Sequence, residues 1–174
     1  MSGNGDSGFD GWATRFGEFY EAGSRPEAEF RFSRMLILAA RRWTTFIDEA
    51  IKQKTGQPRA RWQTLSALAF SDGPIATIEL AERMAVQWPT LVRTLNELEH
   101  EGLIERRINP EDKRSRLVTI TPAGLAVFVE VKRVLDPTRG AILSGFATED
   151  LKAAELLLER FFAAMTAEAG PGAP

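Results

Sequence analysis

Three cations are clustered in the stretch PEDKRSRLVTITPAG, residues 110–124. Lys113, Arg114 and Arg116 follow the acidic pair Glu111 and Asp112 and lead into the alternating run LVTIT. A polar turn followed by such a run predicts the tip of a β-hairpin. Arginines on a projecting tip can enter a DNA minor groove or contact phosphates, whereas the alternative is that the charges only keep the tip soluble. Asp112 either orients a nearby arginine or closes the turn as an Asx cap.

The other reactive side chains leave little room for enzymatic chemistry. The 174 residues include no cysteine and a single histidine, His100. Disulfides, thiol redox switches and cysteine nucleophiles are therefore excluded, and neither a zinc site nor a Ser-His-Asp triad is expected. His100 lies near the end of an expected helix, where a polar cap is its ordinary role. We expect no catalytic activity, no cofactor and no bound metal.

The overall charge differs from that of a typical nucleic-acid-binding protein, because the formal net charge is −2. The positive charge is local: residues 103–118 contain three anions but five cations, namely Arg106, Arg107, Lys113, Arg114 and Arg116. No apolar run approaches the ~20 residues of a membrane span, and the N-terminus does not resemble a signal peptide. We expect a cytoplasmic protein that associates with the nucleoid when it is bound to DNA.

Helices dominate the expected secondary structure. Apolar residues recur at helical spacing over residues 24–54, 61–70, 77–85, 87–100, 121–137 and from 148 onward. Two short segments, 103–107 and 116–120, are expected to pair as one hairpin. Thr77, Thr121 and Thr148 are expected N-caps, and Pro137 is expected to kink or end its helix. The predicted fold class is mainly α with a small β-hairpin.

The helices expected over 77–85 and 87–100 are short and joined by a tight turn, which is typical of a helix-turn-helix. With the hairpin that follows, the unit is a winged helix-turn-helix, and its second helix would read the major groove. Since Leu91, Leu95 and Leu98 define the core side, the outer face should show Gln87, Trp88, Thr90, Arg93, Thr94 and Glu97. Arg93 suits a guanine edge and Thr90 a phosphate or a thymine methyl group. Taken alone, Arg93 could equally be a solvated surface arginine.

Residues 61–124 resemble the MarR family of winged-helix transcription regulators. The resemblance rests on RWQTLSAL, on IELAERMAVQWPTLVRTLNELEHEGLIERR, and on the wing signature D-x-R followed by a strand and T-P-x-G. The phrase PTLVRTLNELEHEGLI is closest to the SlyA-like branch, and the helix order matches over residues 30–168. The resemblance implies a homodimer that binds a pseudo-palindromic double-stranded operator, most often as a repressor.

The resemblance also assigns roles to residues and segments. Thr90 and Arg93 would lie in the major groove, Arg114 in the minor groove, and Lys113 and Arg116 near the backbone, with Gln87 as a further DNA-binding candidate. Residues 24–58 would be a dimerisation helix and 59–121 the winged helix-turn-helix. Residues 1–23 lie outside the resemblance, and they are expected to be flexible or a short extra helix. Residues 122–170 would form the C-terminal dimerisation helices. The sequence PGAP at residues 171–174 predicts a disordered tail.

Regulators of this type commonly release DNA when a small aromatic or carboxylate ligand, or its coenzyme A thioester, binds between the dimer domain and the winged helix. The candidates in this chain are Arg34 and Arg41 as carboxylate clamps, with Trp43 and Trp62 as aromatic walls. The alternatives are core packing for the tryptophans and ordinary surface positions for the arginines. For the whole protein, the alternative function is a winged-helix module that binds another protein and not DNA.

Overall fold

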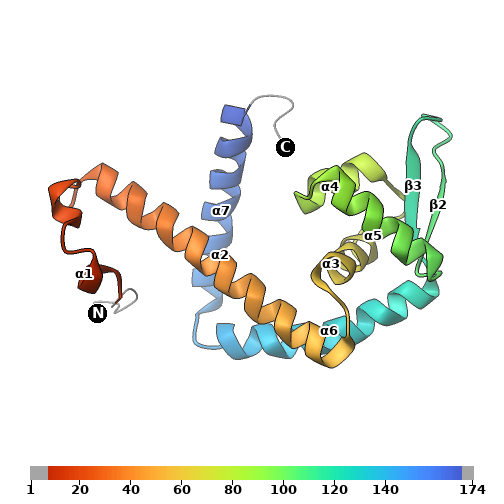
Figure 1. The fold of residues 1–174 in the computed structure, drawn as a ribbon, viewed down its shortest axis with the longest axis horizontal. Helices are drawn as coiled ribbons and strands as arrows, with labels where there is room; N and C mark the ends of the chain where they lie inside the picture. The colour runs from red at the N-terminus through yellow and green to blue at the C-terminus, as the bar shows by residue number, and fades with distance from the viewer. Residues whose placement is uncertain (1–7, 170–174) are drawn as a thin grey trace. The chain divides into compact units, whose positions relative to one another are not determined.

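A computed structural model describes residues 8–169 (Figure 1). The elements in chain order are α1 (Phe9–Trp12), η1 (Phe16–Glu18), α2 (Arg25–Thr55), α3 (Arg59–Ala69), β1 (Ile75–Ala76), α4 (Thr77–Met84), α5 (Trp88–His100), β2 (Ile104–Ile108), β3 (Arg116–Ile120), α6 (Pro122–Leu143) and α7 (Thr148–Ala169). The predicted fold class, mainly α with a small β-sheet, is confirmed. The disorder expected at the chain ends falls outside the described residues.

The chain divides into two units between Phe46 and Ile47, inside the 31-residue helix α2, and each unit is described by itself. The first unit holds α1, η1 and the first part of α2. Its core is a cluster of aromatic rings in which Phe9 is buried against Phe16 and Phe30. The N-terminus of α2 is capped by Ser24, whose Oγ accepts a hydrogen bond from the Glu27 N–H at 3.3 Å. Residues before α2 therefore fold back onto its first turns.

The second unit contains the main hydrophobic core. Apolar faces of α3, α4 and α5 meet the small sheet and the start of α6, and the buried residues include Leu65, Leu80, Leu91, Leu95, Leu98, Ile104, Val118 and Phe128. A smaller cluster joins the end of α2 to the middle of α6 through Ile47, Ile51, Val131 and Leu135. The helical spacing of these leucines gives each short helix an apolar face that it buries in this unit, and packing of this kind supplies most of the stability of short helices.

The sheet has three antiparallel strands in the order β1-β3-β2. The predicted hairpin is confirmed, and its register places Ile104 opposite Ile120 and Ile108 opposite Arg116. The third strand, β1, was not predicted, because a two-residue strand has no alternation of its own. The predicted cap at Thr77 is wrong: Thr77 is the first residue of α4, and its hydroxyl donates to the Arg116 carbonyl oxygen at 3.0 Å. That bond ties the start of the helix-turn-helix to β3.

The T-P-x-G motif connects β3 to α6. Thr121 is the N-cap of α6 as predicted, since its hydroxyl oxygen accepts the Gly124 N–H at 3.1 Å. A Cβ at Gly124 would lie 2.0 Å from the carbonyl oxygen of Leu103, so only glycine fits at this position. Helix α6 continues through Pro137 to Leu143, so of the two expected effects of Pro137, a kink or an end of the helix, the second is wrong.

Helix α7 begins at Thr148, which makes Thr148 its first residue and not the predicted cap. No residue of α7 whose side chain is described is fully buried within this chain. None of the described helices combines the length and the apolar composition that a bilayer-spanning segment needs.

Candidate nucleic-acid interface

A tight left-handed turn sets the start of the candidate recognition helix, α5. Ala85 ends α4 with φ 49° and ψ 45°, and it is the one non-glycine residue with positive φ among residues 8–169. The Val86 N–H donates to the Ala81 carbonyl oxygen at 3.2 Å, which closes the turn. Gln87 then takes an extended conformation as the N-cap, and Trp88 and Pro89 open the helix. A proline at this position needs no intrahelical donor and fixes the helical φ.

The two faces of α5 follow the predicted leucine spacing. Leu91, Leu95 and Leu98 are buried, whereas Gln87, Thr90 and Arg93 are exposed. Thr94, which was expected on the outer face, is only 5% exposed, and its hydroxyl donates to the Thr90 carbonyl oxygen at 3.0 Å. The expectation for Thr94 is therefore wrong, because its position lies between the buried leucines and not opposite them.

Arg93 projects from the middle of the exposed face. Its side chain is 84% exposed, and its Nε donates to Glu97 Oε1 at 3.0 Å one turn later. An exposed i,i+4 pair of this kind contributes only about 0.3–0.5 kcal/mol. Arg93 can therefore exchange Glu97 for a stronger acceptor at small cost. Trp88 is 47% exposed at the beginning of the same helix.

The turn of the hairpin is built by hydrogen bonds from Asn109 and Asp112. The Asp112 carboxylate accepts the backbone N–H of Arg114 at 3.0 Å, and the Asn109 side chain accepts that of Glu111 at 3.0 Å. Asp112 thus closes the turn as an Asx cap. Within residues 8–169, no ion pair joins it to an arginine. The backbone of the tip is fixed while Lys113 and Arg114 stay exposed.

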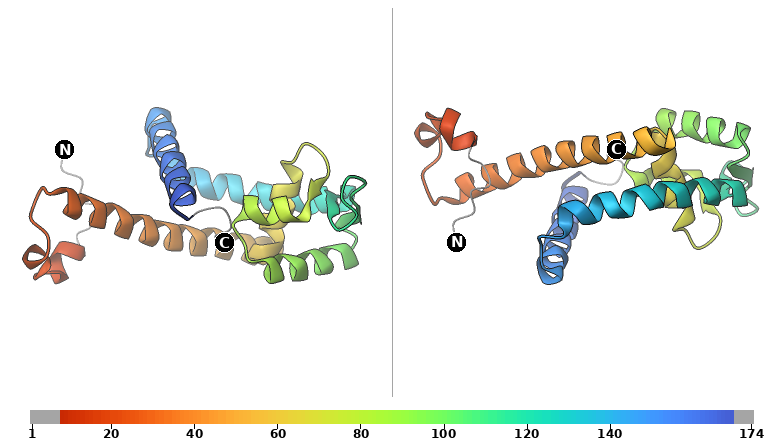
Figure 2. Two further views of the ribbon diagram at one scale, coloured as in Figure 1. Left: turned by 90° about the horizontal axis from the view of Figure 1, so that it is seen from above. Right: turned by 90° about the horizontal axis from the view of Figure 1, so that it is seen from below.

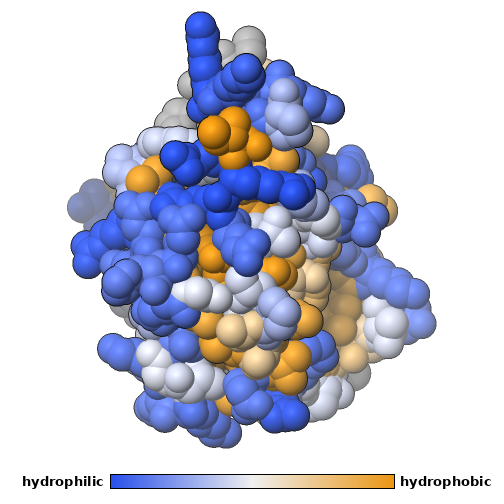
Figure 3. Space-filling model, turned by 90° about the vertical axis from the view of Figure 1, so that its right-hand side faces the viewer, coloured by the Kyte–Doolittle hydropathy of each residue, from blue (hydrophilic) through white to orange (hydrophobic). Residues whose placement is uncertain are grey.

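The hairpin and α5 lie next to each other at one end of the second unit in all three ribbon views (Figures 1 and 2). Arg107, Lys113, Arg114 and Arg116 are exposed on the hairpin, and none of them has an ion pair within the described part of the chain. In the view onto this end, hydrophilic side chains cover the projecting top and surround a central strip of apolar residues (Figure 3). The hairpin thus adds exposed cations that have no ion pair within residues 8–169 beside the exposed face of α5.

Arg106 does not belong to this exposed group, although the sequence counts it among the local cations. Its side chain is 16% exposed. It donates from Nε to Glu99 Oε2 at 2.9 Å and from Nη2 to Asn96 Oδ1 at 2.7 Å. The hydrogen bond from Arg106 is the main cause that lowers the pKa of Glu99, with further help from the charges of Arg106 and Arg116. This pair fastens β2 to the end of α5.

A second pair fixes α5 from the other side. Arg61 on α3 donates two hydrogen bonds to the carboxylate of Glu101, directly after α5, and this contact lowers the pKa of Glu101. Two parallel hydrogen bonds between a guanidinium and a carboxylate fix the relative orientation of the two side chains as well as their distance. The positioning roles of these charged pairs were missed in the sequence, where they read as ordinary surface charges. The sequence indicates these pairs only by placing the acidic residues Glu99 and Glu101 at the end of α5 and arginines in the neighbouring elements α3 and β2.

The candidate effector residues lie in both units. In the first unit, Arg34 lines a cavity, Arg41 is exposed, and Trp43 is 36% exposed. In the second unit, Trp62 packs against the cluster of Ile47 and Val131, and its indole donates to Asp48 Oδ1 at 3.2 Å. Trp62 is thus part of a core. Among the described residues, no group of three or more His, Cys, Asp or Glu side chains could hold a metal ion.

Comparison with known proteins agrees with this geometry. Residues 59–115 match the model of the MarR family. The matched segment is similar to a MarR-family domain. Helices α3, α4 and α5, β2 and the hairpin turn lie inside the matched segment, and β3 directly follows it.

Solved structures share the fold well beyond the matched MarR segment. The transcriptional regulator PA3341 has 28% sequence identity and a TM-score of 0.69, over 77% of this chain and 97% of that chain. The regulator BldR from Sulfolobus solfataricus has 22% identity and a TM-score of 0.69, over 79% and 99%. A cysteine-to-serine variant of MarR from E. coli, in complex with operator DNA, has 20% identity and a TM-score of 0.66, over 80% and 99%.

Proposed function

We propose that the protein is a homodimeric, sequence-specific DNA-binding regulator of transcription, without catalytic activity. The observation that carries the proposal is the exposed face of α5 beside a hairpin whose exposed cations have no ion pair within residues 8–169, in and next to a segment that matches the MarR family. The similar E. coli MarR variant is in complex with operator DNA. By this likeness, α5 would enter a major groove and the hairpin tip an adjacent minor groove.

Direct base contacts would come from the exposed start and middle of α5. Arg93, which is exposed in the middle of the helix, would contact a guanine edge. Thr90 and Gln87 lie nearer the start of the helix and would reach bases or phosphates. Arg114 at the fixed tip suits a narrow minor groove, with Lys113 and Arg116 near phosphates. Because the net charge is only −2, this local arrangement and not a general positive charge would supply the affinity.

The exposed apolar surface supports a dimer. Helix α7 exposes Leu156, Leu157 and Phe162, each by 49% or more, and the first part of α2 exposes Ile37 and Phe46. A soluble monomer rarely exposes so much contiguous apolar surface on one helix, and a symmetric second copy would cover it. A two-fold dimer would present two α5 helices and so favour a pseudo-palindromic operator with half-sites about one helical turn apart.

The regulatory proposals are finer. We propose that the protein is a repressor of the SlyA-like branch, as the phrase PTLVRTLNELEHEGLI suggests. We also propose that a small aromatic or carboxylate ligand, or its coenzyme A thioester, releases the repressor from DNA. A ligand can act only by binding the DNA-competent and the DNA-incompetent dimer with different affinity. A difference of about 1–3 kcal/mol would lower operator occupancy by one to two decades.

Equilibrium titration of double-stranded DNA tests the proposal. The promoter region of the protein's own gene and a scrambled duplex of equal length are compared at fixed salt concentration. We expect tighter binding to the promoter, and weaker binding by Lys113→Ala and Arg114→Ala but not by Arg133→Ala. Arg133 is a matched control because it is an exposed arginine of α6, paired with Glu130. Equal affinity for both duplexes would instead favour a protein-binding module.

A further inference from the structure

The first unit contains a cavity of about 390 Å³ between the α1 region and one face of α2. This volume lies within the range of about 300–1,000 Å³ that is usual for small-molecule sites. The residues that line it are Gly8, Trp12, Arg34, Met35, Leu38, Ala39 and Arg42. The cavity is separate from α5 and the hairpin, and it depends on the segment before α2.

The cavity wall is positively charged. Arg34, Leu38 and Arg42 recur every four residues and therefore lie along one face of α2. No carboxylate is among the described residues that line the cavity. The Arg34 guanidinium is fixed 4.2 Å from the centroid of the Phe9 ring, and Arg42 is exposed and has no ion pair within residues 8–169. Among the described lining residues, Arg42 is therefore the cation that an anion in the cavity would pair with.

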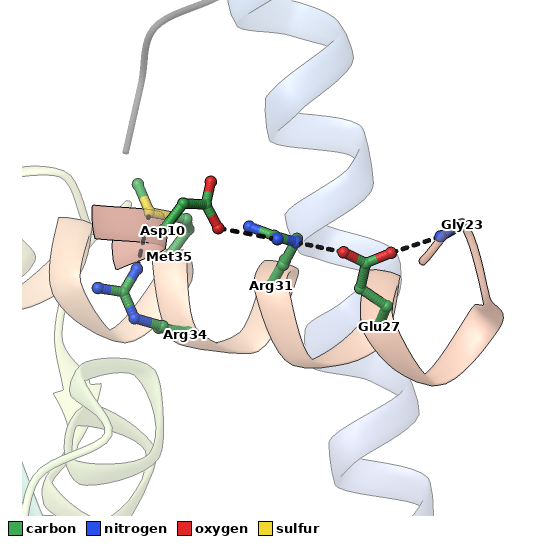
Figure 4. Close-up of polar contacts among 6 residues, drawn as sticks. All are labelled: Asp10, Gly23, Glu27, Arg31, Arg34 and Met35. Carbon is green, nitrogen blue, oxygen red and sulfur yellow. Dashed lines mark hydrogen bonds and ion pairs between the residues drawn. The ribbon is translucent and has the colours of Figure 1, made fainter. Parts of the chain in front are cut away.

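The nearby acidic side chains are held by a different arginine. Arg31 donates to Asp10 Oδ1 at 3.0 Å and to Glu27 Oε1 at 2.8 Å (Figure 4). The second oxygen of Glu27 accepts the Gly23 N–H at 2.6 Å. The hydrogen bond from Arg31 lowers the pKa of Glu27, which keeps this carboxylate ionised and paired. The network anchors the segment before α2, and it does not include Arg42.

The rest of the wall is apolar and well defined. Trp12 is 68% exposed, yet its ring packs edge-on against the buried Phe9 ring at a centroid distance of 5.3 Å. Leu38 and Ala39 on α2 also line the cavity, and the Ala39 side chain is a single methyl group. An exposed tryptophan that is held in place provides a preformed surface for a flat or branched apolar group.

We propose that this cavity binds a small organic carboxylate. The carboxylate would pair with Arg42, and the apolar body would lie between Trp12 and the side chains of Leu38 and Ala39. The inference rests on the proposed function in one respect, since a ligand of the cavity is an effector only if the protein is a regulator. Binding of the ligand itself requires no DNA. It replaces Arg41, Trp43 and Trp62 by Arg42 and Trp12 as the residues that contact the ligand.

Nuclear magnetic resonance of the tryptophan indole N–H groups in the full-length protein tests the proposal. The four indole resonances are recorded during titration with phenylacetate, indole-3-acetate and hexanoate, and Trp12→Phe assigns the signal of Trp12. We expect at least one carboxylate to shift the Trp12 resonance saturably, and the matching neutral amide to bind about tenfold more weakly, because it lacks the charge-assisted contact.

Three variants locate the site. Arg42→Gln should raise the dissociation constant about tenfold, whereas Arg41→Gln, the exposed neighbour that does not line the cavity, should change it by less than about twofold. Ala39→Leu should abolish binding by filling the space. The proposal is overturned if no carboxylate shifts the Trp12 resonance at tens of millimolar, if Arg41→Gln and Arg42→Gln have equal effects, or if Ala39→Leu binds normally while folded.

A parallel DNA titration separates this proposal from the proposed function. The ligand-free protein should bind its operator whether or not Ala39 is replaced. Failure to bind any DNA would contradict the regulator assignment and leave the resonance shifts valid as evidence for the cavity. Normal DNA binding without any Trp12 shift would contradict only the cavity.

Discussion

Substitution of Gly124 tests the packing that joins the hairpin to α6. In Gly124→Ala, the new Cβ would lie 2.0 Å from the Leu103 carbonyl oxygen and 2.9 Å from Ile120 Cγ1. A carbon–oxygen contact is normally no shorter than about 3.3 Å, so the start of α6 must move by roughly 1.3 Å. The Ile120 side chain can adjust, but the Leu103 carbonyl cannot, because it also accepts the Thr121 N–H at 3.0 Å.

The expected cost follows from this contact. Overpacking typically costs about 1–3 kcal/mol, and we expect about 3 kcal/mol here because a backbone atom is in the way. For a chain of 174 residues, that corresponds to a melting temperature about 6–12 °C lower. Differential scanning calorimetry at several protein concentrations measures the change and separates it from dissociation of a dimer.

Gly140→Ala is the matched control, since it makes the same substitution in the same helix. A Cβ at Gly140 would meet no atom within 4 Å. Replacing an interior helical glycine by alanine should therefore stabilise the protein by about 1 kcal/mol. Opposite signs are expected for the two variants. A Gly124→Ala protein as stable as the unmodified one, or equal losses in both variants, would refute the reasoning.

Four further predictions concern the interface. Arg114→Ala should weaken operator binding by about 1–3 kcal/mol per half-site, while the oligomeric state measured by sedimentation should not change. An unaltered affinity would show that Arg114 does not contact the minor groove. Arg93→Ala should lower the ratio of operator to scrambled-DNA affinity, because base contacts specify; equal losses on both duplexes would make Arg93 a phosphate contact. Ala85→Gly should raise the free energy of unfolding by about 0.5 kcal/mol, since glycine adopts positive φ without strain; a loss in urea titration would contradict this. Glu99 and Glu101 have pKa values below their ordinary 4.5, so their stabilisation is complete above that pH and is lost as the pH falls through the lowered values. Glu99→Gln combined with Glu101→Gln should be less stable at neutral pH and should lose less stability in acid, and an unchanged acid profile would count against these pairs.

The sequence predicted the elements of the second unit because their signals are local. Apolar spacing identified α5 and its buried leucines, and the alternating run identified β3 within the hairpin. The T-P-x-G motif gave the cap of α6, but not the reason for its glycine, which is the approach of the Leu103 carbonyl from another part of the chain. Periodicity also placed Thr94 on the wrong face of α5. Thr94 directly precedes the buried Leu95 and lies near the boundary between the exposed and the buried face, where helical spacing does not decide burial.

The features that were missed depend on contacts between distant residues. Arg106 looked like a free cation of the hairpin, and only the return of β2 along α5 brings it to Glu99. The role of residues 9–22 could not be predicted, because their aromatic spacing has no period; it becomes clear when Phe9 packs against Phe30. For the same reason, the cavity beside Trp12 has no signature in the sequence.

Selection of DNA by the purified protein from a random double-stranded pool tests the central claim most directly. The selected duplexes are titrated, and the number of bound protomers is measured by sedimentation. We predict one enriched pseudo-palindrome with half-sites about 10 base pairs apart, two protomers per duplex, and a large loss of affinity when one half-site is scrambled. Absence of any enriched sequence, or binding of a single protomer with no effect of the second half-site, would contradict the account.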